Sequence, residues 1–369
     1  MKANDSPRRR SFSICHQMRL IKYLRHFLIK RRRTWLKKSE EMIDKLPLDE
    51  KEKQRLYAGY CRDIDRYGPK FTEYYYSYRF PELSVKQKRE FISMRDILAI
   101  VEKYRILYPE QWLINRNKER FLTEYASFVH RKWMYVNGSS EKNEVQTFLD
   151  NYDVIVKPTN SCSGNGVYKL HRGEGSADVI LNGGLPAMLE ECIYNEASLA
   201  EFHPASLNTI RVVTISNGKA VKIFGTVLRT GNFNSVFDNA DAGGYFAEID
   251  AETGIVISNG VTEMGEEAEA HPASGKVFKG YQVPRWDEVI DTCKRAALYK
   301  KDATLTAWDV AITDHEIDMI EGNSAPSIEI HQIPLHRGVR KKLYSIMDEL
   351  DLPYRDVMFW IKIMSRVFK

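Results

Sequence analysis

Residues 306–327 read TAWDVAITDHEIDMIEGNSAPS, in which two strand-like runs flank the polar residues 314–316. If 314–316 form the loop of a β-hairpin, the runs pair outward from it and Asp309 lies directly opposite Glu321. Asn323 follows two residues later on the same strand, so its side chain shares the face of Glu321. The stretch therefore predicts two facing carboxylates with a carboxamide beside them.

Facing carboxylates repel, because the Cβ atoms of directly opposed strand residues are only about 4.5–5.5 Å apart. In a half-buried sheet a bound cation or a raised pKa relieves the repulsion, and oxygen ligands of this kind suit Mg²⁺ together with substrate phosphates. The alternative is an exposed hairpin with solvated acids, but the apolar neighbours Trp308, Val310 and Met319 argue against full exposure. Asp318 has odd spacing from Glu321, so we expect it to point to the other face.

A second pattern, DVIVKPTNSCSGNGVYKL, occupies residues 153–170. A strand-like run delivers Lys157, small and polar residues follow, and the chain returns as another run. Small residues allow close backbone approach and expose N–H groups, which suits a polyphosphate, and the strand lysine adds a positive charge. The alternative is an ordinary glycine-containing hairpin with a solvated lysine. The loop residues proposed to contact phosphate are Ser163, Gly164 and Gly166.

Charged residues also occur within three other strand-like runs. In AMLEECI (187–193), Glu190 and Glu191 are consecutive, so they point to opposite faces and one of them can face a ligand. Arg211 and Arg229 lie within the runs 209–215 and 221–230, where a charge usually has a partner or a ligand. A plain salt bridge is the alternative for each arginine.

Several protein classes are excluded by what the sequence lacks. It has no GxxxxGK[ST] motif, so it is not a P-loop protein. It has no HRD motif, and its glycine loop follows the strand lysine rather than preceding it, unlike a protein kinase. Its five cysteines form no CxxC pair, which supports neither a disulfide framework nor a zinc ribbon and favours a reducing cytoplasm.

The N-terminus is a basic leader. Residues 1–40 carry a net charge of +11, whereas the remaining residues carry −6. Apolar residues recur at helical spacing from residue 18 to 38 and basic residues fill the other face, which is typical of a helix lying on an anionic membrane. The alternative is a solvated helix that packs its apolar stripe on the body. The segment is neither a secretory signal nor a membrane span, and no second basic stripe favours nucleic acid.

The overall pattern predicts an α+β protein. Residues 40 to about 135 are helical and poor in strands, with helical periodicity over 86–106. After about residue 150, short apolar runs bounded by Gly, Asn and Asp indicate strands, interrupted by helical patterns at 284–301 and 338–349. The prediction is an α+β nucleotide-binding body behind a helical N-terminal region.

This order of signals resembles the ATP-grasp superfamily: a strand Lys-Pro, a small-residue loop, an acidic hinge strand, an arginine strand, a strand Asp and then Glu-x-Asn. The strings HPASLNTIRVVT (203–214), WDVAIT (308–313) and EGN (321–323), with Asp238-Asn239 and Gly243-Gly244, resemble the sugar-transfer-associated ATP-grasp family. The resemblance covers roughly residues 110–345. It implies an ATP-grasp fold of two α+β subdomains that grip ATP, and these segments: leader 1–40, helical region 41–110, ATP-grasp domain 111–345 and C-terminal helix 346–369.

The resemblance also implies roles for individual residues. ATP would be bound by Lys118, Lys157, the loop residues Ser163, Gly164 and Gly166, and a hinge strand with Glu190 or Glu191 and Ile193. One or two Mg²⁺ ions would be held by Asp309, Glu321 and Asn323. Arg229 and Arg211 would steady the transferred phosphoryl group. One departure is Ala307, since several ATP-grasp ligases carry an arginine two residues before the strand Asp.

The implied reaction is carboxylate–amine ligation through an acyl phosphate, adding an amino acid or similar group to a sugar or cell-surface polysaccharide precursor. The substrates would be a small-molecule carboxylate and an amine, one of them sugar-linked. A lipid-linked precursor would fit a cytoplasmic enzyme whose leader lies at the inner membrane surface. Two alternatives stay open, a phosphotransferase with a hydroxyl acceptor and a non-catalytic nucleotide-binding scaffold. The histidines His203, His271, His331 and His336 could include a substrate ligand, with a structural role favoured for each.

Overall fold

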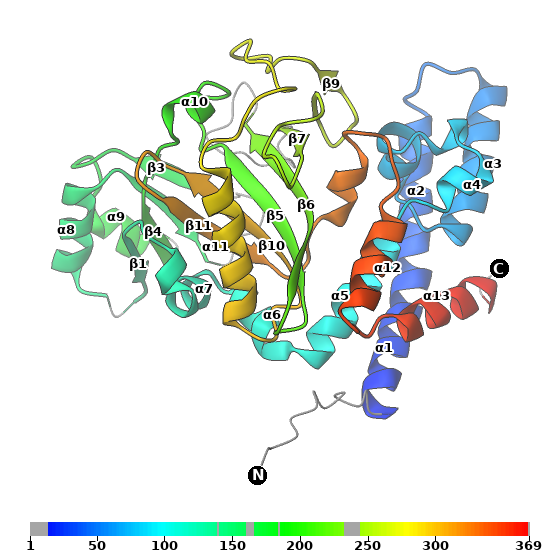
Figure 1. The fold of residues 1–369 in the computed structure, drawn as a ribbon, viewed down its shortest axis with the longest axis horizontal. Helices are drawn as coiled ribbons and strands as arrows, with labels where there is room; N and C mark the ends of the chain where they lie inside the picture. Colours follow the sequence, from blue (N-terminus) through cyan, green and yellow to red (C-terminus); the bar gives the residue numbers. More distant parts are fainter. Residues whose placement is uncertain (1–13, 139, 160–165, 184, 232–243, 368–369) are drawn as a thin grey trace. The chain divides into compact units, whose positions relative to one another are not determined.

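The computed structural model describes residues 14–138, 140–159, 166–183, 185–231 and 244–367 (Figure 1). The chain forms two compact units, one made of residues 1–112 with 336–369 and the other of residues 113–335. The predicted loop residues Ser163 and Gly164 lie outside the described ranges. Within those ranges, no helix combines the length and apolar character needed to cross a bilayer.

The first unit is helical. Its α-helices are α1 (Ile14–His26), α2 (Arg32–Ile43), α3 (Glu50–Arg66), α4 (Val85–Lys88), α5 (Met94–Leu107), α12 (Arg340–Glu349) and α13 (Arg355–Val367), and α6 (Pro109–Arg116) spans the boundary. Shorter turns are η1 (Phe27–Arg31), η2 (Glu73–Ser77) and η3 (Phe80–Glu82). Helix α3 begins at a capping box, in which the Asp49 carboxylate accepts the N–H of Glu52 and the Glu52 carboxylate accepts the N–H of Asp49.

The leader packs part of its apolar stripe onto this unit. Leu20 of α1 is 1% exposed and lies in a cluster with Ala99 of α5 and with Val357 and Ile361 of α13. The stripe therefore contributes to the core of the helical unit, as the alternative reading of the leader expected.

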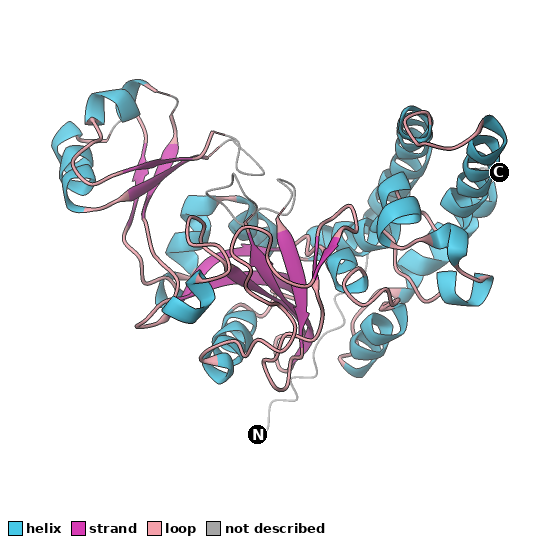
Figure 2. Ribbon diagram, turned by 90° about the horizontal axis from the view of Figure 1, so that it is seen from above, coloured by secondary structure: helices cyan, strands magenta, loops and turns pink. Residues whose placement is uncertain are grey.

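The second unit contains two antiparallel sheets, whose strands are magenta in Figure 2. The smaller sheet has the order β1-β4-β2-β3, made of β1 (Trp133–Val136), β2 (Val154–Pro158), β3 (Tyr168–Leu170) and β4 (Ala187–Glu191). Helices α8 (Lys142–Asn151) and α9 (Ala177–Asn182) share an apolar cluster with this sheet. The unit also contains α7 (Lys118–Glu124), η4 (Ala126–Phe128) and α10 (Ala197–Ala200).

The larger sheet has the order β11-β10-β5-β6-β7-β8-β9. Its strands are β5 (Thr209–Ser216), β6 (Val221–Thr230), β7 (Tyr245–Ile249), β8 (Gly260–Val261), β9 (Glu267–Ala268), β10 (Leu305–Ile312) and β11 (Ile317–Asn323). Figure 1 shows α11 (Trp286–Tyr299) lying across this sheet. Together with the helical unit, the two sheets confirm the predicted α+β class.

The two faces of the larger sheet have opposite character. One face carries Val212, Leu228, Trp308 and Val310, which share the main apolar core with Val289 and other residues of α11. The other face carries charged residues. It is covered in part by the turn η6 (Ile328–Gln332), since a Cβ added at Gly225 would lie 2.5 Å from Nδ1 of His331. Alternation along each strand therefore separates the core from the candidate site.

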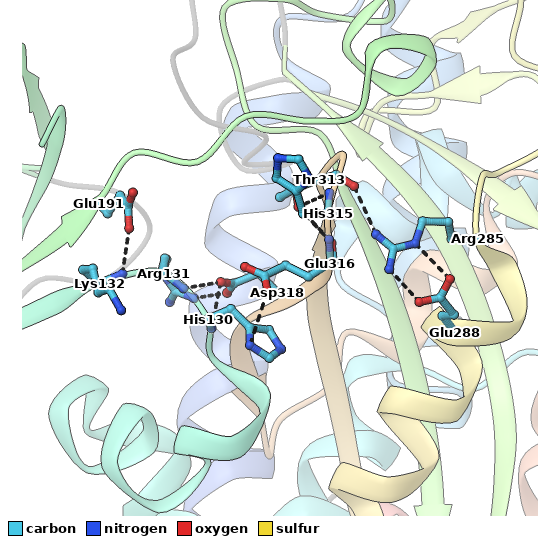
Figure 3. A network of polar contacts seen from close by, with 10 residues as sticks. All are labelled: His130, Arg131, Lys132, Glu191, Arg285, Glu288, Thr313, His315, Glu316 and Asp318. Atoms are coloured by element: carbon cyan, nitrogen blue, oxygen red, sulfur yellow. Dashed lines mark hydrogen bonds and ion pairs between the residues drawn. The ribbon is translucent and has the colours of Figure 1, made fainter.

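The hairpin of β10 and β11 confirms one prediction and corrects two. Asp309 pairs with Glu321 as expected. The loop, however, contains four residues, Thr313–Glu316, and not three, because the Thr313 hydroxyl accepts the N–H groups of His315 and Glu316 and draws Thr313 into the turn (Figure 3).

A β-bulge compensates for the longer loop. Asp309 pairs with Glu321 but Val310 pairs with Met319, so Ile320 is an extra residue in β11. The bulge reverses the alternation that the sequence suggested for Asp318. Asp318 pairs with Ala311, two residues from Asp309, and it therefore lies on the charged face rather than on the other one.

Candidate functional site

The centre of the candidate site is a buried carboxylate held by two arginines. Asp309 of β10 pairs in register with Arg211 of β5, and Arg229 lies on the neighbouring strand β6. Arg211 donates from Nε to Oδ1 of Asp309 at 2.7 Å and from Nη2 to Oδ2 at 2.6 Å, which is a bidentate pair. Arg229 Nη1 donates to Oδ2 at 3.0 Å. Three strands thus converge on one side chain that is 2% exposed.

The arginines fix the charge of Asp309. Burial by itself would raise the pKa of this carboxyl, but the positive charges of Arg211 and Arg229 outweigh it and lower the pKa to about 2. Asp309 is therefore ionised at neutral pH. Two positive charges around one negative charge leave the cluster with a net positive charge, which suits an anionic ligand.

Glu321 and Asn323 continue the site along β11. Asn323 donates from Nδ2 to Oε1 of Glu321 at 2.8 Å, and Glu321 is exposed. Because Nδ2 of Asn323 makes this hydrogen bond, the carboxamide oxygen of Asn323 points away from Glu321. Two carboxylates and one carboxamide are oxygen donors of the type that Mg²⁺ takes alongside phosphate oxygens. In the part of the chain that the structure describes, no group of three His, Cys, Asp or Glu side chains is placed to hold a metal by itself.

A second charged network joins the two sheets. Arg131 donates from Nε to Oε2 of Glu190 on β4 at 2.8 Å. It also donates from Nη1 to Oδ1 of Asp318 on β11, as Figure 3 shows. Lys157 of β2 lies with Nζ 2.8 Å from the same oxygen of Glu190. The backbone N–H groups of His130 and Arg131 complete the shell around Asp318, at 3.0 and 2.7 Å.

This network fixes the phosphate lysine predicted from the sequence. Burial would raise the pKa of Glu190, but the charges of Lys157 and Arg131 lower it to about 2. Glu190 is 3% exposed and its carboxylate holds the Lys157 ammonium. Arg131 could not be singled out beforehand, because it precedes β1 in an irregular segment without a motif.

The two glutamates of β4, the predicted hinge strand, point to opposite faces of the sheet, as expected from alternation. Glu190 faces Lys157, whereas Glu191 is half-buried and accepts the N–H of Lys132 at 2.9 Å (Figure 3). The chain then leaves the sheet, and Ile193 lies two residues beyond the end of β4, half-buried. Glu190 is therefore engaged with the lysine, and Glu191 and Ile193 lie at the exit of the strand.

The structure also describes Gly166 and Lys118, two residues predicted to contact ATP. Gly166 has φ 73°, a left-handed conformation that glycine adopts without strain. Lys118 is the first residue of α7, whose Phe121 contacts Gly322, since a Cβ added at that glycine would lie 2.8 Å from Phe121 Cε2. Helix α7 therefore packs beside the Glu321–Asn323 end of β11. Ala307, the departure noted in the sequence, pairs with Asn323, and Arg211 and Arg229 supply the cations near Asp309.

Comparisons with known proteins give one family and several structural relatives. Residues 175–348 match the model of the sugar-transfer associated ATP-grasp family. No curated protein matches the sequence. The ATP-grasp ligase PsnB in complex with a minimal precursor is 15% identical, over 64% of this chain and 63% of that one, with a TM-score of 0.38.

Two other solved structures give similar values. An ADP complex of purK, N5-carboxyaminoimidazole ribonucleotide synthetase, is 15% identical over 60% of this chain and 51% of that one, with a TM-score of 0.39. D-alanine–D-alanine ligase from Bacillus anthracis is 14% identical over 69% and 68%, with a TM-score of 0.35.

These TM-scores are low and the chain spans only 63% of the PsnB chain, so the family assignment rests on the sequence match. That match includes Glu190, Arg211, Arg229, Asp309 and Glu321, while Lys118 and Lys157 precede it. The match over residues 175–348 confirms the resemblance of this part of the chain to the sugar-transfer associated ATP-grasp family.

Proposed function

We propose that this protein is an ATP-dependent carboxylate–amine ligase that acts through an acyl phosphate. The observation that carries the proposal is the Arg211–Asp309–Arg229 cluster beside Glu321 and Asn323. It combines buried positive charge with oxygen donors, which is what transfer of a phosphoryl group from Mg·ATP requires. The match of residues 175–348 to the sugar-transfer associated ATP-grasp family, which includes all five residues of this site, supports the proposal.

The nucleotide would bind between the two sheets' charged groups. Lys157, already held by Glu190, would contact phosphate oxygens, with Gly166 allowing the backbone to approach them. The exit of β4 at Glu191 and Ile193 would receive the adenine and ribose, and Lys118 would add a second positive charge.

Asp309, Glu321 and Asn323 would hold Mg²⁺, which neutralises charge on the phosphates when it is bound. Asp309 would keep Arg211 and Arg229 oriented, so that their positive charge offsets the negative charge on the transferred phosphoryl group. A substrate carboxylate oxygen attacks the γ-phosphorus and ADP leaves. An amine then attacks the acyl carbon, and phosphate leaves with formation of an amide.

The family description supports a sugar-linked substrate. We propose that the amide attaches an amino acid or similar group to a sugar or a polysaccharide precursor. Product analysis tests this proposal against its main alternative. A ligase yields ADP, phosphate and an amide, whereas a phosphotransferase yields ADP and a phosphorylated hydroxyl acceptor.

The experiment incubates the full chain with Mg·ATP, a panel of amino acids and sugar carboxylates, and hydroxylamine as a general amine. The proposal expects a hydroxamate to form together with equal amounts of ADP and phosphate. The Arg229→Lys variant should reduce the rate, since a lysine ammonium lacks the planar, fixed set of donors that a guanidinium presents. Formation of a phosphorylated product without free phosphate would establish the phosphotransferase, and no turnover at all would favour the scaffold.

We further propose that residues 18–38 bring the enzyme to the inner membrane surface from the cytoplasm through their basic face. Leu20 is used in packing, so charge rather than insertion would supply the attraction. Flotation with vesicles containing anionic lipid should recover the full chain, and recovery should fall at high salt. Equal flotation with neutral vesicles, or with a version lacking residues 1–38, would contradict this placement.

A further inference from the structure

The turn at residues 203–208 is built rigidly beside the candidate site. Asn208 is fully buried and donates from Nδ2 to the carbonyl oxygens of Leu199, at 3.0 Å, and His203, at 3.3 Å. The side chain of Asn195 in turn accepts the N–H of Asn208 at 2.7 Å and donates to its carbonyl at 2.8 Å. These bonds fix the backbone that carries His203 and Ser206.

Two polar atoms of this turn have no hydrogen-bond partner among the residues that the structure describes. They are Nδ1 of His203 and Oγ of Ser206, and the two residues are 4% and 7% exposed. Leaving a buried polar atom without a partner costs roughly 1–3 kcal/mol, so native structures rarely keep one unless a ligand or water binds there. The two atoms therefore mark a place prepared for a polar group.

Both atoms converge on Gly231. A Cβ added there would lie 2.6 Å from Ser206 Oγ and 3.3 Å from His203 Nδ1, so both atoms lie against the α-carbon of Gly231 and only glycine fits between them. His271 contacts the same glycine. Its Nε2 donates to the Gly231 carbonyl at 2.9 Å and its Nδ1 accepts the N–H of Ala273 at 3.2 Å. Burial lowers the pKa of His271, so this ring is neutral, and both of its nitrogens are hydrogen-bonded.

The chain connects Gly231 directly to the Arg211–Asp309–Arg229 cluster. Gly231 follows Arg229 by two residues, and Arg229 donates to Asp309. Thr209, which directly follows Asn208, pairs with Arg229 in the sheet. The two unpartnered atoms thus lie at the end of β6, next to the arginine proposed to hold the transferred phosphoryl group.

We propose that His203, Ser206 and Gly231 form the subsite for the acceptor amine, with His203 Nδ1 as the base. The inference rests on the proposed ligase activity. The amine nitrogen attacks the carbonyl carbon of the acyl phosphate, the new C–N bond forms, and the C–O bond to phosphate breaks. Phosphate leaves with the bonding electrons, and the proton released by nitrogen passes to Nδ1. Ser206 Oγ holds the amine by a hydrogen bond and orients its lone pair.

Chemical labelling tests the subsite without any substrate. Diethyl pyrocarbonate acylates imidazole nitrogens that are unprotonated and accessible. Labelling for minutes also modifies a buried histidine that becomes accessible transiently, as binding of an amine at this subsite would require. On the full chain, mass spectrometry should find His203 modified along with the exposed His315, and His271 protected. Gly231→Ala should slow labelling of His203, whereas Gly138→Ala, with nothing within 4 Å of its added Cβ, should not. A His203 as unreactive as His271 overturns the subsite.

Turnover tests the base. The His203→Gln variant should lose about 100-fold in amide formation with glycinamide as the amine, the scale of general base catalysis. Hydroxamate formation should persist, because hydroxylamine is already unprotonated at neutral pH. The exposed control His315→Gln should behave as wild type, and the stabilisation of all variants by Mg·ATP should be equal.

The outcomes separate the two proposals. If the wild type forms no amide or hydroxamate, the ligase activity fails, and the labelling alone decides whether a subsite exists at His203. If the wild type is active and His203→Gln forms amide at the wild-type rate, the assignment of His203 as base is wrong.

Discussion

At the scale of single residues, Arg131 is a buried side chain that links strands β4 and β11 of the two sheets. It is 5% exposed and bonds Glu190, Asp318 and the carbonyls of Met319 and Ile320. Removing one partner of a buried ion pair leaves uncompensated charge and costs roughly 3–5 kcal/mol. It also releases the Glu190 carboxylate that holds Lys157, so we expect stability and the proposed nucleotide binding both to depend on Arg131.

Arg131→Ala should therefore lower the free energy of unfolding by about 3–5 kcal/mol and weaken ATP binding. The matched control is Arg295→Ala, which breaks an exposed pair with Asp291 and should cost less than about 1 kcal/mol. Urea unfolding of both variants measures the difference. Equal, small losses would mean that the network contributes little.

The two depressed carboxyl pKa values predict acid sensitivity. Asp309 and Glu190 have pKa values of about 2, below the roughly 4 of an unfolded chain, so both bind fewer protons when folded. The stability they contribute is complete above pH of about 4 and is lost as pH falls toward 2. Urea unfolding between pH 5 and 3 should show this decline.

Asp309→Asn removes one titrating group from that range. Its free energy of unfolding should fall with decreasing pH less steeply than that of the wild type, by up to about 1.4 kcal/mol per pH unit. A slope identical to that of the wild type would show that Asp309 is not ionised by its arginines as described.

At the scale of elements, the hairpin of β10 and β11 shows what the sequence could and could not predict. The pairing of Asp309 with Glu321 followed from strand alternation and is confirmed. The loop length and the bulge at Ile320 could not be predicted, because the fourth loop residue depends on hydrogen bonds to the Thr313 hydroxyl. The loop is one residue longer than predicted and the bulge adds one residue to β11, so the two differences cancel at Asp309. The position of Asp318, which depends on only one of them, was wrong.

Gly322, between the two proposed metal ligands of β11, has a packing reason that the motif alone did not reveal. It pairs with Trp308, and an added Cβ would lie 2.8 Å from Phe121 Cε2 and 3.0 Å from Trp308 Cζ3. Gly322→Ala should overpack this contact and cost about 1–3 kcal/mol in urea unfolding. Gly138→Ala is the control, and a Gly322→Ala variant as stable as that control would contradict the packing.

At the scale of the whole molecule, the candidate site lies entirely within residues 113–335, while the leader belongs to the helical unit. Leu20→Asp should destabilise the protein by more than about 3 kcal/mol, since it places a charge in an apolar cluster. Met18→Asp changes an exposed residue of the same helix and should have little effect. Thermal unfolding distinguishes the two, and equal stability would show that the leader does not pack as described.

Across the molecule, strand positions and the α+β class followed from short apolar runs, because alternation and length are local properties. The partners of the charged residues could not be predicted from such local patterns. The pairing of Arg211 with Asp309 depends on β5 lying beside β10, and Arg131 depends on two sheets meeting, both of which are long-range features. The convergence of His203 and Ser206 on Gly231 likewise appears only once the turn and β6 are placed together.

The central claim, that this site binds Mg·ATP, is tested most directly by a thermal-shift titration with ATP, with and without Mg²⁺. The variant is Glu321→Gln, which leaves the ion pairs of Asp309 intact, and the control is Asp314→Asn in the exposed hairpin loop. At ligand about 100-fold above Kd, binding stabilises a protein by roughly 2.7 kcal/mol. We predict a Mg²⁺-dependent rise in Tm for the wild type and Asp314→Asn and a much smaller one for Glu321→Gln. No shift with millimolar ATP, or a shift in Glu321→Gln equal to that of the wild type, would contradict the claim.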